Sequence, residues 1–227
     1  MESIVTSSPY AETTVTVGVE AETAQVVCVF VHGRTQSPAE MIEQVIRHLD
    51  APTTHFVLPK SDGAAWYNAR AIDPLTAEAR TEMDASLDIL AQTIAIACAQ
   101  SPQARLVLAG FSQGACLIIE YMMRCGPWDG AACLFTGCRV GVATDDRPIA
   151  ALLNMPIYAS NGNTDPWIPA ANYMEMCLTL MESGARLRTD VFPGREHGTS
   201  PTECQALNSM LMEVAAGFSI FDNFEEA

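Results

Sequence analysis

Short runs of β-branched and apolar residues alternate with longer helix-like patterns along most of this chain. Apolar runs without polar alternation are typical of strands that are buried on both faces of a parallel sheet. Six such runs are predicted as strands, at residues 25–31, 55–59, 105–110, 131–137, 157–162 and 187–192. The alternation predicts an α/β fold, with a mostly parallel sheet and helices on both faces.

Five segments with helical patterns separate these strands, at residues 38–49, 76–99, 113–125, 169–183 and 201–216. Two of them begin with a serine followed by proline, at Ser37 and Ser200, which predicts an N-cap with proline in the first helical turn. The segment 14–19 is expected to add an antiparallel edge strand. Ligands of such a sheet bind at the carboxyl ends of the strands, so the loops there are the place to look for chemistry.

The length and composition predict a single domain. No Pro/Gly/Ser-rich linker divides the 227 residues, and 49% hydrophobic residues supply a large core. We expect residues 1–227 to form one domain, with a core at about 25–216 and an acidic tail at 222–227 that frays. The segment 60–76 is too short for a lid domain, which predicts an open site.

The formal net charge of −15 argues against nucleic acid and anionic membrane surfaces as partners. No apolar stretch approaches the roughly 20 residues needed to cross a bilayer, and the first residues do not resemble a signal peptide. We therefore expect a cytoplasmic protein without stable membrane insertion. The sequence leaves a homodimer open.

The eight cysteines are predicted to be free thiols, because most of them lie among apolar residues of expected strands and helices. The chain contains no CxxC motif, and Cys133 with Cys138 has no matching Cys/His pair elsewhere. No metal site and no cofactor are expected.

The segment GFSQG, Gly110–Gly114, matches the G-x-S-x-G pattern of a nucleophile elbow. Alone the pattern is weak, since many short matches are inert turns. Here it directly follows a predicted buried strand and opens a predicted helix, as the motif requires. A sharp turn at this point would expose the hydroxyl of Ser112, which makes Ser112 the candidate nucleophile.

A serine nucleophile needs a histidine base, and the histidine needs a carboxylate that orients it. His197 is the only histidine after Ser112, and it follows the last predicted strand. Asp165 precedes it by one strand and lies in a turn-rich loop, where an aspartate that only stabilises the turn is the alternative. Asp145 and Asp146 are the second choice for the acid, and Asp190 falls inside a predicted strand.

An oxyanion hole needs backbone N–H donors close to the nucleophile. The N–H of Gln113, directly after the serine, is the first candidate, and the N–H of Arg34, in the segment HGR after the first core strand, is the second. His32 in the same segment is expected to orient or pack against neighbouring groups rather than to act as a base.

Five segments in this order, FVHGR, AAWYN, LAGFSQGA, GNTDPWIP and EHG, resemble the phospholipase/carboxylesterase family. This lidless branch of the α/β-hydrolases also includes acyl-protein thioesterases. The resemblance covers about residues 26–198. It implies an α/β-hydrolase fold, a triad of Ser112, Asp165 and His197, and oxyanion donors at Arg34 and Gln113. The implied substrate is a carboxylic ester, which could include a lysophospholipid, cleaved through an acyl-enzyme.

Other readings remain open at this point. A thioesterase, a peptidase or a dienelactone-type hydrolase would use the same triad on a different bond, and a non-catalytic ligand-binding protein could keep a hydrolase shell. The chain departs from the eukaryotic thioesterases, which have HGLGD where this sequence has HGRTQSP. The Arg34 side chain could bind a substrate carboxylate, but we expect it to pair with Glu40 or Asp62.

Four aromatic residues near the expected site are candidates for the substrate pocket. Trp66 and Tyr67 lie in the loop after the second core strand, Phe111 flanks the nucleophile, and Trp167 follows the candidate acid. Packing in the core or at the rim is the alternative for all four, and it is equally expected for Tyr67 and Phe111.

Overall fold

The computed structural model describes residues 14–217, and they build one seven-stranded sheet. Its order is β1-β3-β2-β4-β5-β6-β7, and every neighbouring pair is parallel except β1 with β3. The strands are β1 (Thr14–Gly18), β2 (Val26–Val31), β3 (Thr54–Pro59), β4 (Arg105–Phe111), β5 (Gly130–Phe135), β6 (Pro156–Gly162) and β7 (Arg186–Phe192). The predicted parallel sheet and antiparallel edge strand are confirmed, while the predicted acidic tail lies outside the described residues.

Residues 14–217 also form five α-helices: α1 (Pro38–Gln44), α2 (Ala77–Gln100), α3 (Gln113–Cys125) and α4 (Ala170–Glu182), which connect strands, and α5 (Pro201–Ala215), which follows the last one. Ser37 and Ser200 cap α1 and α5 by accepting the N–H of Glu40 and Glu203 respectively, as predicted. The expected helix over 38–49 is interrupted. At Val45 the backbone leaves the α region (φ −127°, ψ −63°), and the chain continues as a short 3₁₀ turn, Ile46–His48.

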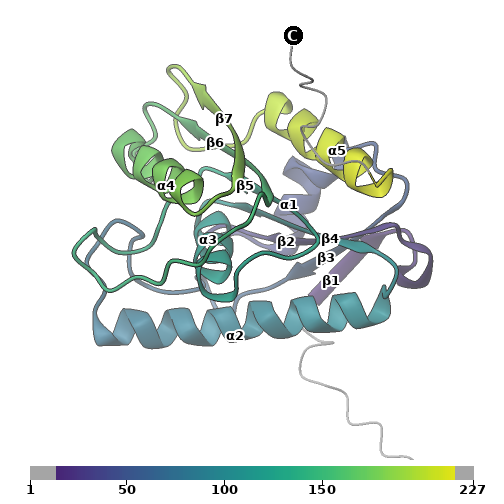
Figure 1. The fold of residues 1–227 in the computed structure, drawn as a ribbon, viewed down its shortest axis with the longest axis horizontal. Helices are drawn as coiled ribbons and strands as arrows, with labels where there is room; N and C mark the ends of the chain where they lie inside the picture. Colours follow the sequence, from purple (N-terminus) through teal and green to yellow (C-terminus); the bar gives the residue numbers. More distant parts are fainter. Residues whose placement is uncertain (1–13, 218–227) are drawn as a thin grey trace, which may run out of the picture.

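The helices lie on opposite faces of the sheet, with α2, α3 and α4 on one face and α1 and α5 on the other (Figure 1). The side chains of strand β2 pack alternately against the helices on the two faces of the sheet. Val27 and Val29 pack in the cluster beneath α2 and α3, whereas Cys28 and Phe30 pack in the cluster beneath α1 and α5. Successive side chains of a strand point to opposite faces, so a strand between two helical layers must be apolar throughout.

The strand order reverses direction at β2, which has β3 on one side and β4 on the other. Loops that leave the carboxyl ends of β2 and β4 therefore diverge and open a crevice, the usual ligand position in such sheets. Helix α5 starts at this edge and runs to the opposite one. At its end, a Cβ built on Gly217 would lie 3.7 Å from the guanidinium of Arg105, the first residue of β4.

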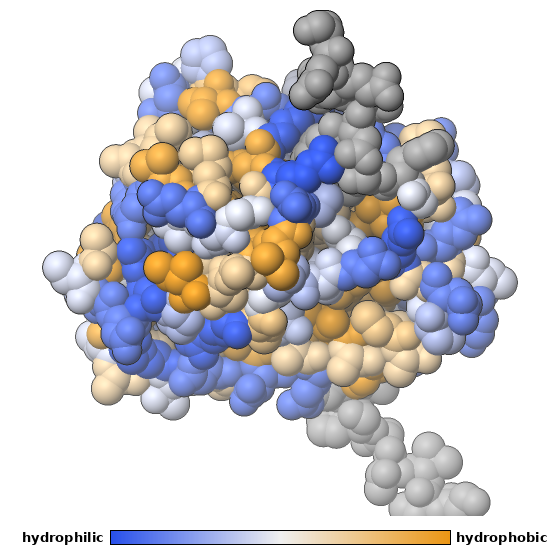
Figure 2. Space-filling model, in the orientation of Figure 1, coloured by the Kyte–Doolittle hydropathy of each residue, from blue (hydrophilic) through white to orange (hydrophobic). Residues whose placement is uncertain are grey.

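The surface view shows hydrophilic residues over much of this face, with hydrophobic residues in separate patches (Figure 2). Among the helices of residues 14–217, none combines the length and apolarity needed to cross a membrane. All eight cysteines are free thiols, as predicted.

Candidate active site

Ser112 sits on a tight turn between β4, which ends at Phe111, and α3, which begins at Gln113. Its backbone has φ 54° and ψ −119°, a conformation that non-glycine residues rarely adopt. Gly114 makes the turn possible, because a Cβ there would lie 2.1 Å from the carbonyl oxygen of Val31. The strained turn aims the serine hydroxyl away from the helix, toward the loops at the carboxyl edge.

Three side chains that the sequence singled out form a continuous hydrogen-bonded chain. His197 Nε2 lies 2.8 Å from Ser112 Oγ, and its Nδ1 lies 2.7 Å from Asp165 Oδ2. The Asp165 side chain is fully buried, while His197 is 20% exposed. A carboxylate at Nδ1 makes that nitrogen the proton donor, which leaves Nε2 free to accept the serine proton.

The second carboxylate oxygen of Asp165 fixes the acid in place. Oδ1 accepts the backbone N–H of Trp167 at 2.8 Å and of Ile168 at 2.9 Å. Burial alone would raise the pKa of this carboxyl, but the hydrogen bonds from His197 and the two backbone N–H groups outweigh it and lower the pKa. Asp165 is therefore ionised at neutral pH and cannot rotate without losing two hydrogen bonds.

Glu203, a residue that sequence reasoning passed over, anchors the loop that carries His197. Its side chain is completely buried, and it accepts hydrogen bonds from Ser160 of β6, from the Arg195 guanidinium and from Ser200. In the sequence, its position three residues after Ser200 indicated only a residue in the first turn of a capped helix. Its contact with Ser160 could not be predicted, because β6 is remote from Glu203 in the chain.

The loops that carry the acid and the base are also joined directly. The carbonyl oxygen of Arg195 accepts the Thr164 hydroxyl at 2.8 Å and the Thr164 backbone N–H at 3.3 Å. Thr164 precedes Asp165, and Arg195 lies two residues before His197. This contact sets the relative position of the two side chains before either meets a substrate.

The candidate oxyanion donors lie on both sides of the nucleophile. Gln113 is the first residue of α3, so its N–H has no partner within the helix. The loop of Arg34 passes close by, since a Cβ on Gly33 would lie 3.2 Å from the Cβ of Ser112. The Gln113 side chain holds the opposite loop by accepting the Trp66 N–H and donating to the Tyr67 carbonyl oxygen.

His32 has a structural role, as the sequence suggested. Its Nδ1 donates to the carbonyl oxygen of Gly33 at 2.7 Å, and its Nε2 accepts the N–H of Ser61 at 3.1 Å. Burial, the dominant effect, lowers the pKa of this imidazole. A buried neutral ring with both nitrogens occupied orients the loop and takes no proton from a substrate.

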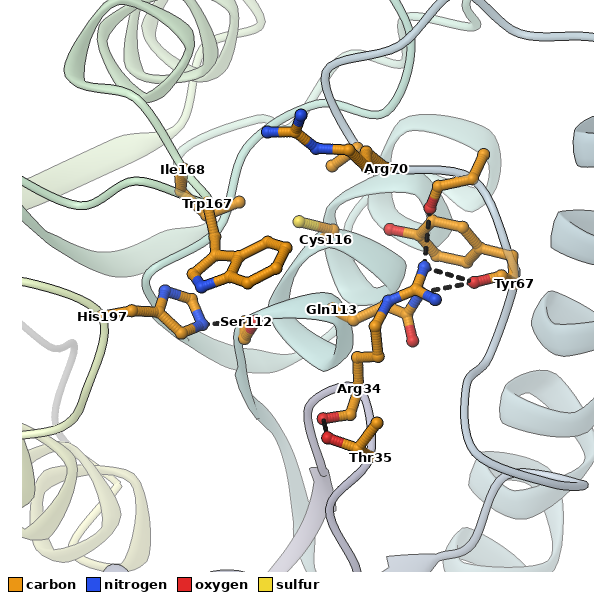
Figure 3. A pocket seen from close by; sticks show the side chains of 12 residues that line it. Arg34, Thr35, Tyr67, Arg70, Ser112, Gln113, Cys116, Trp167, Ile168 and His197 are labelled. Atoms are coloured by element: carbon orange, nitrogen blue, oxygen red, sulfur yellow. Dashed lines mark hydrogen bonds between the residues drawn. The ribbon is translucent and has the colours of Figure 1, made fainter.

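A cavity of about 310 Å³ opens beside the serine (Figure 3). Of the four candidate aromatic residues, Tyr67 and Trp167 line it. Trp66 and Phe111 do not, which corrects the prediction for these two. The Trp66 indole is buried and donates to the His32 carbonyl oxygen, and the Phe111 ring packs 5.1 Å from the imidazole of His197.

The Arg34 side chain has different partners from those predicted. Its Nη2 donates to three backbone carbonyl oxygens, those of Tyr67, Asn68 and Ala69, at 2.8 to 3.0 Å. The expected pairing with Glu40 or Asp62 is wrong, because the loop after β3 folds over the guanidinium and offers closer acceptors. Arg34 thereby ties its own loop, which carries the candidate oxyanion donor, to the rim of the pocket.

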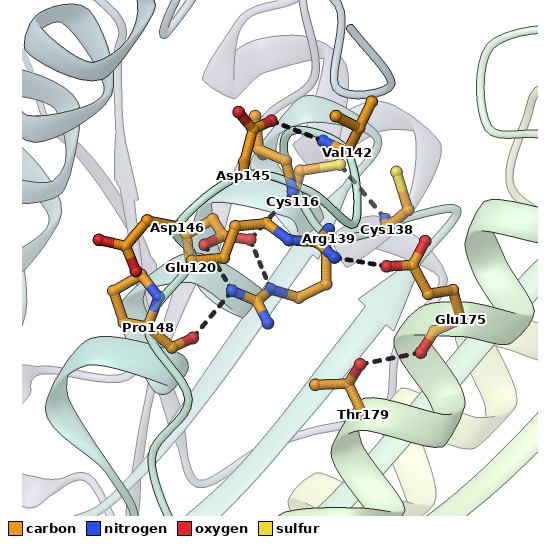
Figure 4. A network of polar contacts seen from close by, with 12 residues as sticks. Cys116, Glu120, Cys138, Arg139, Val142, Asp145, Asp146, Pro148, Glu175 and Thr179 are labelled. Atoms are coloured by element: carbon orange, nitrogen blue, oxygen red, sulfur yellow. Dashed lines mark hydrogen bonds and ion pairs between the residues drawn. The ribbon is translucent and has the colours of Figure 1, made fainter. Parts of the chain in front are cut away.

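The second choice for the acid, Asp145 and Asp146, lies beside a separate buried ion pair (Figure 4). Glu120 of α3 and Arg139 form a bidentate ion pair at 2.7 and 3.2 Å, and both side chains are at least 95% buried. In the adjoining loop, Asp145 Oδ2 accepts the N–H of Val142 and of Leu75. These contacts give Asp145 a structural task away from His197.

Asp145→Asn is expected to lower the melting temperature by a few degrees and leave kcat for ester hydrolysis unchanged. The two backbone N–H groups lower the pKa of this carboxyl, so its stabilisation is present above the unfolded-state pKa and is lost as the pH falls through the folded-state pKa. The stability difference between wild type and variant should therefore shrink in acid. Thermal melts at neutral and acidic pH, with kcat measured in parallel, test this. A collapse of kcat would make Asp145 the triad acid instead.

Within residues 14–217, no group of three or more His, Cys, Asp or Glu side chains is placed to hold a metal ion.

A serine on a tight strand-turn-helix junction at the carboxyl edge of a parallel sheet, with an aspartate and a histidine after it in that order, is the arrangement of the α/β-hydrolase fold. The family model for phospholipase/carboxylesterase matches residues 12–215. The chain belongs to this family and is a carboxylic ester hydrolase. No curated protein matches it in sequence.

Solved structures agree with this placement. A phospholipase/carboxylesterase from Dyadobacter fermentans DSM 18053 is 28% identical, with a TM-score of 0.79 over 88% of this chain and 96% of that one. Esterase PE8 is 20% identical, with a TM-score of 0.72 over 89% and 98% of the two chains. The Bacillus cereus carboxylesterase is 15% identical, with a TM-score of 0.68 over 88% and 93%. The last two show the fold alone.

Proposed function

We propose that the protein is a serine esterase that cleaves small carboxylic esters through an acyl-enzyme on Ser112. The observation that carries the proposal is the hydrogen-bonded chain from Ser112 through His197 to the buried, ionised Asp165. A hydroxyl held 2.8 Å from an oriented imidazole is in reach of direct proton transfer. The same chain would have no purpose in a protein that only binds a ligand.

In the first half of the reaction, Ser112 Oγ attacks the ester carbonyl carbon while His197 Nε2 takes the hydroxyl proton. The carbonyl oxygen becomes an oxyanion, which the N–H groups of Arg34 and Gln113 stabilise. Collapse of this intermediate breaks the carbon–oxygen bond to the alcohol. The leaving alcohol takes the proton from the imidazolium, and the acyl group stays on the serine.

In the second half, a water molecule gives a proton to His197 and attacks the acyl carbon. The second intermediate collapses to release the carboxylic acid, and the proton on His197 returns to Ser112 Oγ. Asp165 stabilises the imidazolium in both halves and stays ionised, which agrees with its lowered pKa.

Labelling by a fluorophosphonate, together with a panel of para-nitrophenyl esters, tests the proposal. We expect the probe to attach to Ser112 and the short-chain esters to be hydrolysed, because the cavity of about 310 Å³ is small and open. A protein that neither reacts with the probe nor turns over any ester would contradict the proposal. Running an acyl thioester beside the matching ester separates an esterase from a thioesterase.

The proposed compartment is the cytoplasm. Eight free cysteines, six of them buried, support a reducing environment.

A further inference from the structure

The lining of the active-site cavity has the opposite charge from the rest of the protein. The chain holds 27 acidic and 12 basic residues, yet the residues that line this cavity include two arginines, Arg34 and Arg70, and no aspartate or glutamate. A cavity with cationic walls in a strongly anionic protein focuses a positive potential on its contents. Such a field attracts a negatively charged group to the site.

The two arginines differ in the hydrogen-bond and ion-pair partners of their guanidinium groups. Nη2 of Arg34 is occupied by three carbonyl oxygens, as described above. Arg70 is exposed, and no carboxylate among residues 14–217 lies within ion-pair distance of it. Glu82, a carboxylate that contacts this loop, instead accepts the backbone N–H and the side-chain amide of Asn68. The Arg70 guanidinium thus has its donors available.

Trp167 connects Arg70 to the catalytic residues. The guanidinium carbon of Arg70 lies 6.0 Å from the centre of the indole ring, within cation–π range. Figure 3 shows the Trp167 indole between the imidazole of His197 and the guanidinium of Arg70. Trp167 is 58% exposed, although tryptophan usually buries most of its surface. Its ring is an apolar surface that lies between the catalytic residues and the guanidinium of Arg70.

We propose that Arg70 binds a carboxylate on the substrate, and that the preferred substrates are anionic esters in which this carboxylate lies apart from the scissile bond. The inference rests on the proposed function and names the substrate class for the same site. A guanidinium presents two parallel N–H groups that match the two oxygens of a carboxylate. The aliphatic or aromatic segment between carboxylate and ester would lie along Trp167.

Two matched pairs of esters test the inference. Para-nitrophenyl hydrogen adipate against para-nitrophenyl hexanoate places the charge on the acyl side, and para-acetoxybenzoate against its methyl ester places it on the alcohol side. Wild type should favour the anionic member of at least one pair. In Arg70→Gln, kcat/KM for the anionic ester divided by kcat/KM for the neutral ester should fall about tenfold. A loss of this size is usual when one hydrogen bond to a charged group is removed.

The change should appear mainly in KM, because a remote carboxylate is bound alike in the ground state and the transition state. Arg70→Lys should keep part of the preference, and added salt should weaken it in wild type. Arg47→Gln is the matched control. It removes the same charge from an exposed residue that pairs with Glu43 and does not line the cavity, so the ratio should not change.

An equal ratio in wild type and Arg70→Gln for both pairs would overturn the inference, while hydrolysis of the neutral esters would keep the proposed function. Failure of wild type to hydrolyse any of the four esters would instead remove the proposed function, and the inference with it.

Discussion

Ser112→Ala is expected to reduce kcat for ester hydrolysis by about 10⁴- to 10⁶-fold, the loss usual for removal of a triad nucleophile. The Oγ atom is the only part of the side chain that the proposed reaction uses. An alanine keeps the Cβ that the turn already accommodates at φ 54°, so no new strain arises. The measurement is kcat on a para-nitrophenyl ester, with purified wild type and variant at equal concentration.

Two controls make this result interpretable. The melting temperature and the circular dichroism spectrum of the variant should match those of wild type, because the serine hydroxyl contributes no packing to the core. The fluorophosphonate should no longer label the protein. Turnover close to wild type in a pure, folded variant would show that another residue is the nucleophile.

Asp165→Asn is expected to lower kcat by about 10⁴-fold with little change in KM. The amide oxygen of an asparagine can still accept the N–H groups of Trp167 and Ile168, so the loop should stay folded. The amide nitrogen then faces His197 Nδ1 and donates to it. This forces the proton onto Nε2, which can no longer accept the proton of Ser112.

The comparison of Asp165→Asn with Asp145→Asn separates catalysis from folding. Both carboxylates accept two backbone N–H groups, but only Asp165 also contacts the imidazole. The first substitution should therefore affect mainly kcat, and the second only stability. An Asp165→Asn protein with wild-type kcat would exclude this residue as the acid of the triad, while the nucleophile and the base could still stand.

The sheet and its helices were predictable because each element repeats one local pattern. A strand between two helical layers must be apolar at every position, and that requirement leaves runs that are easy to recognise in the sequence. The exception is the segment 38–49, where the chain changes from an α-helix to a 3₁₀ turn at Val45. Nothing in the local apolar spacing marks that change.

The site was predictable where one motif determined it and unpredictable where distant loops meet. The position of Ser112 follows from the strand, the glycines and the helix around it. The partners of Arg34, by contrast, are carbonyl oxygens more than 30 residues away, and a backbone acceptor has no signature in the sequence. For the same reason the sequence could not show that Tyr67, and not its neighbour Trp66, lines the cavity, since both side chains are buried.

The course of α5 has a practical consequence. The helix starts beside the loop of His197 and ends near the first residue of β4, at the edge of the sheet opposite the cavity. A surface or fusion partner attached directly at Gly217 would lie on the side of the sheet away from the pocket and leave the pocket facing outward. Immobilised in that orientation, the protein would keep free access for substrate without any change to the residues around Ser112.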